Sequence, residues 1–485
     1  MKRLLCAAGL AAASLLSGPA SATIVYLANG SLTGSAAGAG ADLSGLTGTL
    51  ENGQAANLLG GIGSGLAYAG GNTFIAVPDR GPNAVAYNAA IDNTTSYISR
   101  FQTMTLGLTQ SAGGALPFTL TPTLTATTLL YSPTALVYGS GNGLGTKLDG
   151  TPLGSGAPTI NTASANYFTG RSDNFAAGSS SSDPRNARFD PEGVRVSADG
   201  KSVFISDEYG PYIRQFDRAT GALIKTIALP GNLAVANQSP VGDTEIAGNT
   251  TGRVANKGME GLAITPDGKT LVGIMQAALE QDPAGLLRIV TVDIASGTTH
   301  EYGYKLSGGS GVSEIVAIND HQFLVDERDG KGMGDGTNAK VKQLYVVDIN
   351  GAADITTLSG SAAAAATGVT KSAKPFLDLV SALTAAGIPA SQIPAKIEGL
   401  AFGQDVTFNG ATYHTLFIAN DNDFVAAGGA NQFFVFGFQD ADLPGFVAQN
   451  IAALPEPGSW ALMIAGLGMV GGLLRRRRKA TLAAA

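Results

Sequence analysis

The chain has 485 residues, of which 44% are hydrophobic and 14% charged, and its 66 glycines are typical of many short strands joined by turns rather than of a helical bundle. Its net charge of −7 disfavours a nucleic-acid partner and favours the binding of cations. The only cysteine, Cys6, lies in the N-terminal leader, which excludes disulfides, thiolate metal sites and cysteine nucleophiles from the rest of the chain.

The first 22 residues have the pattern of a secretory signal peptide. Lys2 and Arg3 precede an apolar run over residues 4–16, and Ala20-Ser21-Ala22 supplies a small-residue cleavage site. We therefore expect an exported chain that begins near Thr23, with one folded domain over residues 23–452.

A repeat runs through this domain, and each copy begins with a short apolar strand. The copies are Glu192-Gly193-Val194-Arg195-Val196, Glu260-Gly261-Leu262-Ala263-Ile264, Glu314-Ile315-Val316-Ala317-Ile318, Glu398-Gly399-Leu400-Ala401-Phe402 and a weaker one, Ser64-Gly65-Leu66-Ala67-Tyr68. Turn signals such as Asp199-Gly200 and Asp267-Gly268 follow, and then a second, a third and a fourth strand. Four antiparallel strands repeated radially are the pattern of a β-propeller blade.

The spacing of the copies sets the expected number of blades. The long separation between Ser64 and Glu192 leaves room for one or two further blades, so we expect six or seven blades in an all-β fold. Before the last copy, the apolar residues Phe376, Leu379 and Leu383 share one helical face, which predicts a short helical insertion.

The last segment, residues 453–485, has a pattern of its own. Pro455-Glu456-Pro457 precedes an apolar run over residues 458–474, and Arg475-Arg476-Arg477-Arg478-Lys479 closes it, which predicts a transmembrane helix with a cytoplasmic basic end. This order resembles the PEP-CTERM sorting signal of Gram-negative bacteria. The resemblance implies transient anchoring in the inner membrane, processing by an exosortase-type enzyme, and a final place at the cell surface or outside the cell.

Acidic residues recur at equivalent positions of the repeats and predict a metal site. If the first strands line a central channel, their glutamates converge with the acids that end the second strands. Crowded carboxylates repel one another, and Ca²⁺ relieves this repulsion because it accepts six to eight oxygen ligands. The predicted ligands are Glu192, Asp207, Glu208, Glu260, Glu314, Asp326, Glu327, Glu398 and Asp421, of which Glu192, Asp207, Glu208 and Glu260 are also predicted to activate water.

Basic residues accompany these acids and point to an anionic substrate. Arg80, Lys257, Arg328 and Lys396 are predicted to contact a phosphate group. A purely structural role for the repeated acids, as ion pairs between blades, is the alternative. The sequence contains no Gly-x-Ser-x-Gly elbow and no P-loop, which disfavours a serine hydrolase and a P-loop nucleotide hydrolase.

Several segments together resemble the bacterial "esterase-like activity of phytase" family. They are Asp79–Pro82, Phe189–Gly193, Ile205–Tyr212, Asn256–Ala263, Asp326–Asp329, Lys396–Phe402 and Asn420–Phe424. The resemblance implies a β-propeller related to calcium-dependent alkaline phytases, and hydrolysis of a small phosphorylated substrate.

We therefore expect an exported hydrolase of phosphate esters that uses carboxylate-bound Ca²⁺. Two other functions fit the same pattern. One is a metal-dependent lactonase or carboxylester hydrolase, and the other is a non-enzymatic propeller, stabilised by Ca²⁺, that binds the cell surface or a biofilm matrix.

Overall fold

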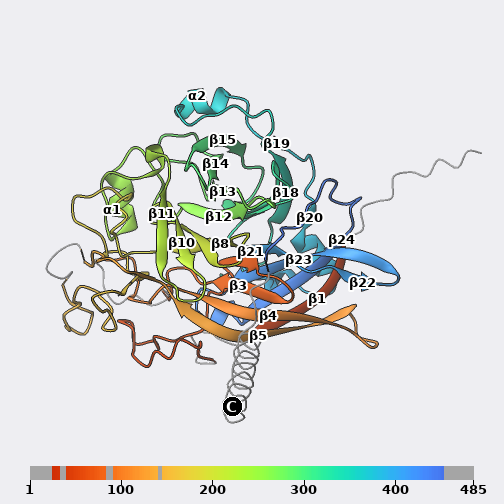
Figure 1. Ribbon diagram of the computed structural model, residues 1–485, viewed down its shortest axis with the longest axis horizontal. Helices are drawn as coiled ribbons and strands as arrows, with labels where there is room; N and C mark the ends of the chain where they lie inside the picture. Colours follow the sequence, from red (N-terminus) through yellow and green to blue (C-terminus); the bar gives the residue numbers. More distant parts are fainter. Residues whose placement is uncertain (1–23, 33–39, 83–90, 140–144, 453–485) are drawn as a thin grey trace, which may run out of the picture.

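The computed structural model describes residues 24–32, 40–82, 91–139 and 145–452, which form a five-bladed β-propeller (Figure 1). The predicted signal peptide over residues 1–22 and the predicted sorting and transmembrane segment over residues 453–485 lie outside the described residues. Among the helices of the described part, none has the length and apolar character needed to cross a membrane.

Four blades are built from consecutive strands that run from the axis outward. Blade 1 contains β2 (Gly65–Tyr68), β3 (Thr73–Val77), β4 (Arg100–Gln110) and β5 (Phe118–Leu129). Blade 2 contains β8 (Pro191–Val196), β9 (Ser202–Asp207), β10 (Tyr212–Asp217) and β11 (Leu223–Ala228). Blade 3 contains β12 (Met259–Ile264), β13 (Thr270–Met275), β14 (Leu286–Asp293) and β15 (Thr299–Lys305). Blade 4 contains β16 (Gly311–Ala317), β17 (Gln322–Arg328) and β18 (Lys342–Asp348), which pairs with the short β19 (Thr370–Lys371) and β20 (Leu377–Asp378).

Distant parts of the chain complete blade 5 together. Its inner strands are β21 (Lys396–Phe402), β23 (Ala411–Asp421) and β24 (Asn431–Phe438), and β22 (Val406–Phe408) forms a hairpin with β23. The outer strand is β1 (Val25–Leu32), which pairs antiparallel with β24. The innermost strands contact one another in the order β2, β8, β12, β16, β21 and back to β2, so the ring is closed.

The prediction of six or seven blades is wrong, because the stretch between the first two inner strands folds differently. β4 and β5 form one long hairpin, and the part that follows contains only the two-stranded pair β6 (Tyr131–Ser132) and β7 (Asn166–Tyr167) among its described residues. Phe168 and Phe189 from this part pack against Phe216 of blade 2. Its apolar residues are therefore buried against an existing blade.

The short helices lie in the connections between strands. The predicted helical insertion is confirmed as α3 (Leu379–Ala385), whose N-cap, Asp378, accepts a hydrogen bond of 2.9 Å from the backbone N–H of Ser381. Its Leu379 and Leu383 are buried. The others are α1 (Gly242–Ala247), α2 (Gly360–Ala365) and the 3₁₀ turns η1 (Gly231–Leu233), η2 (Ala390–Gln392) and η3 (Ala426–Gly428).

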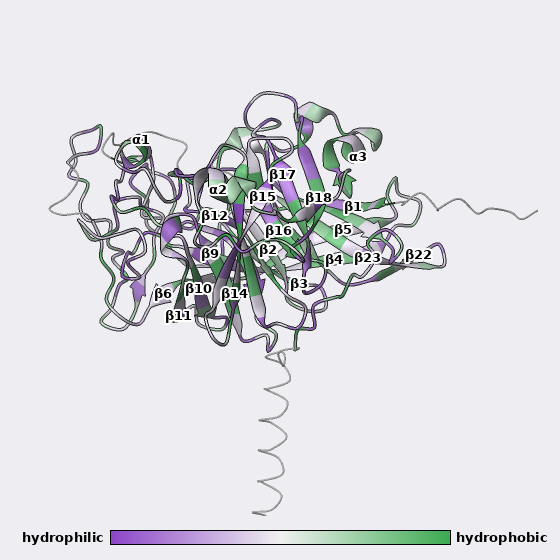
Figure 2. Ribbon diagram, turned by 90° about the horizontal axis from the view of Figure 1, so that it is seen from above, coloured by the Kyte–Doolittle hydropathy of each residue, from purple (hydrophilic) through white to green (hydrophobic). Residues whose placement is uncertain are grey.

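The hydrophobic core lies between neighbouring blades. Ile75 and Val77 of blade 1 pack with Val203 and Ile205 of blade 2, and equivalent clusters fill the other interfaces between blades. Figure 2 shows the corresponding apolar stretches along the strands. The core therefore holds the blades at fixed positions around the axis.

The glycine that follows the repeated glutamate is required by the close packing of the inner strands. A Cβ atom on Gly193 would lie 2.4 Å from the backbone nitrogen of Leu262, and one on Gly65 would lie 2.2 Å from the backbone oxygen of Glu192. The pairing register also shifts at this point in the inner strands of blades 2 to 5. A bulge changes the direction of the neighbouring side chains. In the Glu-Gly pattern, the glycine is therefore required by strand packing, whereas the glutamate is the predicted metal ligand.

Replacement of Gly193 by alanine is expected to destabilise the propeller, because backbone atoms of the next blade cannot move away. Overpacking of this kind costs about 1–3 kcal/mol. Thermal unfolding of Gly193→Ala should show a melting temperature several degrees below the unmodified protein. The control is Gly48→Ala, since nothing lies within 4 Å of a Cβ atom built there. Equal melting temperatures for the two variants would contradict the packing argument.

Candidate functional site

Three of the repeated glutamates converge at the end of the ring where the inner strands begin. Glu192 of β8, Glu260 of β12 and Glu398 of β21 line one cavity of about 210 Å³. Six carboxyl groups and four cationic side chains line this acidic cavity: Asp79, Glu192, Glu208, Glu260, Glu398 and Asp421, with Arg80, Lys257, Arg328 and Lys396. All four basic residues predicted from the sequence therefore lie at one place.

The aspartates at the ends of the second strands form turns that position their neighbours. Asp79 accepts a hydrogen bond of 2.9 Å from the backbone N–H of Gly81, and Asp207 accepts one of 3.0 Å from that of Tyr209. Such side-chain turns are typical of aspartate. They direct the next residues, Arg80 and Glu208, into the acidic cavity, whereas Asp207 itself is not part of its lining.

Two groups of three acids have the spacing of a metal site. Oxygens of Asp190, Glu192 and Glu208 all lie within 4.8 Å of one another, and so do oxygens of Asp79, Asp421 and Asp423. In the second group Lys396 is already present, with its Nζ atom 3.0 Å from Asp421 and 2.5 Å from Asp423.

The first group is less neutralised. Arg80 donates to Asp190 from its backbone nitrogen at 2.9 Å and from Nη1 at 2.7 Å. Among the described residues, neither Glu192 nor Glu208 forms an ion pair. Of the carboxyl groups that line the cavity, Asp79, Glu192 and Glu208 therefore form no ion pair with the described residues, and Glu192 and Glu208 belong to the first group of three acids.

Burial makes ionisation of these carboxyl groups costly. It raises the pKa of Glu192 well above the ordinary value, and Glu260 and Asp190 raise it further. It raises the pKa of Glu208 to about 7, with a further contribution from Asp190. A side-chain interaction with Glu260 acts in the opposite direction and lowers the pKa of Glu208.

These residues fit a hard divalent cation. Ca²⁺ binds oxygen at about 2.3–2.6 Å, so ligands on opposite sides of one ion lie about 5 Å apart. The oxygens of Asp190, Glu192 and Glu208 meet this requirement. Within the described part of the chain, Oε2 of Glu260 is also buried without a hydrogen-bond partner. The donors are all oxygen atoms, which suits Ca²⁺ better than a softer metal.

The prediction that all the repeated acids converge is met only in part. Glu314 lies deeper in the channel, where it accepts backbone hydrogen bonds from Leu262 and Ile315 and pairs with Arg195 at 3.1 Å. Glu327 lies elsewhere, where it binds Lys371 and the hydroxyl of Tyr304.

Asp326 is also outside the lining of the acidic cavity. Both of its oxygens are buried without a hydrogen-bond partner among the described residues, and burial raises its pKa to about 7. Four of the predicted ligands, Asp207, Glu314, Asp326 and Glu327, therefore lie outside the lining of the acidic cavity. The residue that sequence reasoning missed is Asp190. It has no counterpart in the other repeats, although it directly precedes Pro191 and Glu192 in a segment that resembles the esterase-like activity of phytase family.

The cations of the cavity differ in their partners. Arg328 pairs with Glu398 at 2.5 Å and with Glu260 at 3.5 Å, so its positive charge is already neutralised by these two acids. Lys257 is exposed, and it forms no ion pair with the described residues. Lys257 is therefore the cation best placed to contact a ligand.

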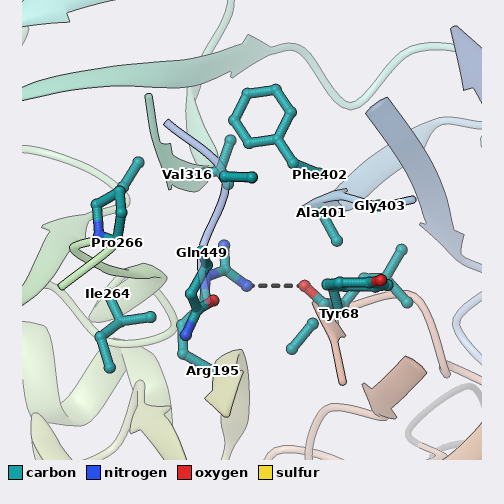
Figure 3. A pocket seen from close by; sticks show the side chains of 13 residues that line it. Tyr68, Arg195, Ile264, Pro266, Val316, Ala401, Phe402, Gly403 and Gln449 are labelled. Atoms are coloured by element: carbon teal, nitrogen blue, oxygen red, sulfur yellow. Dashed lines mark hydrogen bonds between the residues drawn. The ribbon is translucent and has the colours of Figure 1, made fainter. Parts of the chain in front are cut away.

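A separate pocket, lined by Arg195 and Gln449 among others, lies at the opposite end of the inner strands (Figure 3). The guanidinium of Arg195 donates to the backbone oxygens of Leu66 and Ile315, at 2.7 and 2.8 Å. The segment over residues 447–452 crosses this end, and Gln449 donates to the backbone oxygen of Val196 at 2.9 Å. This pocket shares no lining residue with the acidic cavity.

A known protein family matches the part of the chain that contains the acidic cavity. The family described as "Esterase-like activity of phytase" matches residues 57–424, and the PEP-CTERM protein-sorting motif matches residues 453–479. The chain belongs to the esterase-like activity of phytase family. An uncharacterized secreted protein of Arthroderma benhamiae is 31% identical over 260 residues, which cover 47% of this chain and 46% of the relative. The chain thus spans about half the length of this curated relative.

Solved structures that resemble this phytase-like propeller are distant. A putative 6-phosphogluconolactonase from Bacteroides uniformis is 14% identical, with a TM-score of 0.29, and the match covers 79% of this chain and 88% of that one. A gluconolactonase from Xanthomonas campestris is 11% identical, with a TM-score of 0.28, and the match covers 77% of this chain and 85% of that one.

The sorting motif, together with the secreted relative, supports export to the cell surface, and it implies an exosortase-type processing partner.

The raised pKa values predict that the metal-free protein loses stability as the pH rises. Folding raises the pKa of Glu208 and of Glu398 from 4.5 to about 7, so the folded state binds more protons than the unfolded state between these values. The stabilisation is complete below about pH 4.5 and is lost as the pH passes 7. Melting temperatures measured in chelator should therefore fall between pH 5 and pH 8.

Two comparisons test whether this fall comes from the acidic cavity. The variant Glu208→Gln cannot ionise at this position, so its melting temperature should fall less steeply with pH. Ca²⁺ added at pH 8 should raise the melting temperature of the unmodified protein more than that of the variant. A flat pH profile for the unmodified protein would contradict the electrostatic argument.

Proposed function

We propose that this protein hydrolyses phosphate monoesters in its acidic cavity. The observation that carries the proposal is the presence, in one cavity, of an oxygen-only donor set beside cationic side chains, one of which has no ion pair among the described residues. Acids that were only structural would be expected to have their own cations, as Glu314 and Glu327 do. Within the part of the chain that the structure describes, Glu192 and Glu208 form no ion pair.

Asp190, Glu192 and Glu208 are the proposed ligands of a Ca²⁺ ion, and Glu260 lies next to them through its hydrogen bond with Glu208. When bound, the ion would supply positive charge that offsets the repulsion between these carboxylates and stabilises negative charge on phosphoryl oxygens. The group Asp79, Asp421 and Asp423 is a weaker candidate because Lys396 occupies it.

The side chains of the cavity have distinct roles in the proposed reaction. Lys257 and Arg80 bind oxygens of the phosphate group and orient the phosphorus atom. A carboxylate of the Glu208 and Glu260 pair accepts a proton from the attacking water as the new P–O bond forms. The P–O bond to the alcohol breaks, and the alkoxide takes a proton from solvent. Arg328 acts indirectly, since it holds Glu260 and Glu398 in place.

The position of the C-terminal segment suggests how the protein is presented. Residues 447–452 lie across the end of the channel opposite the acidic cavity, and the sorting motif begins at residue 453. We propose that anchoring through this motif, before an exosortase-type enzyme processes it, leaves the cavity on the face away from the membrane.

Removal of one proposed ligand should abolish most of the activity. Glu208→Gln is expected to lower kcat for a chromogenic phosphate ester by about 100-fold or more, because the side chain loses both its charge and its basicity. The matched control is Asp320→Asn, since the side chain of Asp320 is 78% exposed and lies in a turn. Chelator should abolish turnover by the unmodified protein, and Ca²⁺ should restore it.

Other outcomes of this experiment identify the competing functions. Turnover of lactones or aryl acetates without turnover of phosphate esters would replace the proposal by a lactonase or carboxylester hydrolase. A large increase in melting temperature with Ca²⁺, but no hydrolysis of any ester, would replace it by a Ca²⁺-stabilised binding module.

Removal of the free cation should weaken substrate binding more than chemistry. Lys257→Met is expected to raise KM for the phosphate ester by about tenfold, since a charge-assisted hydrogen bond to phosphate contributes roughly 1.5–3 kcal/mol. Lys269→Met is the control, because the side chain of Lys269 is 77% exposed in a hairpin turn. An unchanged KM in Lys257→Met would remove Lys257 from the proposed site.

A further inference from the structure

The last described residues, 443–452, lie across the end of the inner strands that is opposite the acidic cavity, and we call them the C-terminal strap. The backbone N–H of Val447 donates to the backbone oxygen of Ile318, next to β16 of blade 4, at 2.8 Å. The backbone N–H of Ala452 donates to the backbone oxygen of Ala198, after β8 of blade 2, at 2.9 Å. The strap therefore connects blades that are not neighbours in the sequence.

The first part of the strap, residues 443–446, is anchored in the hydrophobic core. Leu443 is 2% exposed and belongs to the core cluster of blades 4 and 5. The ring of Phe446 packs on the rings of Phe402 and Phe438, with centroids 4.6 and 5.2 Å apart. Release of this part would expose apolar surface to water, which is costly.

The second part, residues 447–452, is held only at the surface. Besides the two backbone hydrogen bonds, the side chain of Gln449 donates to the backbone oxygen of Val196 at 2.9 Å. Val447 is 50% exposed, and the side chain of Ile451 is only partly buried against the core of blades 1 and 2. Segments with few buried apolar contacts and exposed backbone hydrogen bonds open locally at a low free-energy cost. This part can therefore leave the surface while the anchor stays in place.

The sorting motif begins directly after the strap, at residue 453. Its Pro455-Glu456-Pro457 triplet starts three residues after Ala452, and three residues reach at most about 10 Å. A peptide that binds in a cleft of a folded partner lies extended over several residues, so a docked strap keeps the triplet too close to the propeller. If residues 447–452 are released, nine residues separate the triplet from Phe446, and they reach about 30 Å.

We propose that residues 447–452 are a reserve of chain that leaves the propeller surface when an exosortase-type enzyme binds the sorting motif. The partner takes the released segment in extended form, and the docked strap is the state that resists processing. Residues 443–446 remain in the core, so the propeller stays folded during cleavage. This role depends on the sorting motif and not on the proposed reaction in the acidic cavity.

A disulfide that locks the strap tests this proposal. Ala198→Cys combined with Ala452→Cys places cysteines at two residues that share a backbone hydrogen bond, and residues 23–452 contain no other cysteine. The full chain is exported in a bacterium that has an exosortase-type enzyme, and the processed fraction is followed by pulse labelling. The locked protein should be processed at least tenfold more slowly than either single-cysteine variant, which are the matched controls.

A longer linker separates the reach of the chain from other effects of the disulfide. About ten Gly and Ser residues inserted between Ala452 and Ala453 should restore fast processing of the locked protein, because they supply the length that the strap withholds. Slow processing despite this insertion would overturn the proposal. Equal rates for the locked protein and the single-cysteine variants, with the disulfide shown by mass spectrometry, would overturn it as well.

Hydrogen exchange of the purified full chain measures release of the strap without any disulfide. The amides of Val447 and Ala452 should exchange at least 100-fold faster than those of β12, since local opening exposes them without unfolding of the propeller. The amide of Phe446, which donates to the backbone oxygen of Leu443 in the anchor, should exchange more slowly than that of Val447. Exchange of the whole strap at the rate of β12 would contradict the proposal, because the strap would then open only when the propeller unfolds.

Discussion

Repulsion between carboxyl groups that a closed ring forces together is the constraint on which this site depends. The inner strands approach so closely that positions such as Gly65 and Gly193 have no space for a Cβ atom. Bulges at the same points direct Glu192, Glu260 and Glu398 into one cavity. The strands cannot move apart to relieve the repulsion, because pairing of β1 with β24 closes the last blade. Only positive charge can relieve it.

Basic side chains of the protein supply part of that positive charge. Their positions distinguish acids that form ion pairs within the fold from acids that are proposed to bind a metal ion. Arg195 neutralises Glu314 inside the channel, and Lys371 neutralises Glu327 away from the axis. In the acidic cavity, Arg328 serves Glu260 and Glu398. Among the described residues, Asp79, Glu192 and Glu208 have no such partner, and Glu192 and Glu208 together with Asp190 also have the spacing of a metal site.

Much of the fold could be predicted from the sequence because the signals are local. The apolar repeat copies and the Asp-Gly turns that follow them predicted β8 and β12 closely, and the helical face of Leu379 and Leu383 predicted α3. The number of blades was not predictable in this way. From the sequence, Phe168 and Phe189 could belong to an additional blade or could cover an existing one. Their packing on Phe216 of blade 2 shows that they cover an existing blade.

The candidate site was predictable to the extent that the repeat encodes it. Equivalent positions of a radial repeat meet at the axis, which brought Glu192, Glu260 and Glu398 together as expected. Glu314 differs in a way that the sequence does show, since isoleucine follows it where the other copies have glycine. Asp190 has no counterpart in the other repeat copies, so the periodicity of the sequence could not predict it.

The direction of the inner strands explains why the acidic cavity and the last described residues lie at opposite ends of these strands. In each blade that carries it, the repeated glutamate is near the start of the inner strand, so the acids gather at one end of the axis. The carbonyl oxygens beyond the other end of these strands accept hydrogen bonds from the last described residues, including those from Val447 to Ile318 and from Gln449 to Val196. The last described residues, which directly precede the sorting motif, therefore lie away from the acidic cavity.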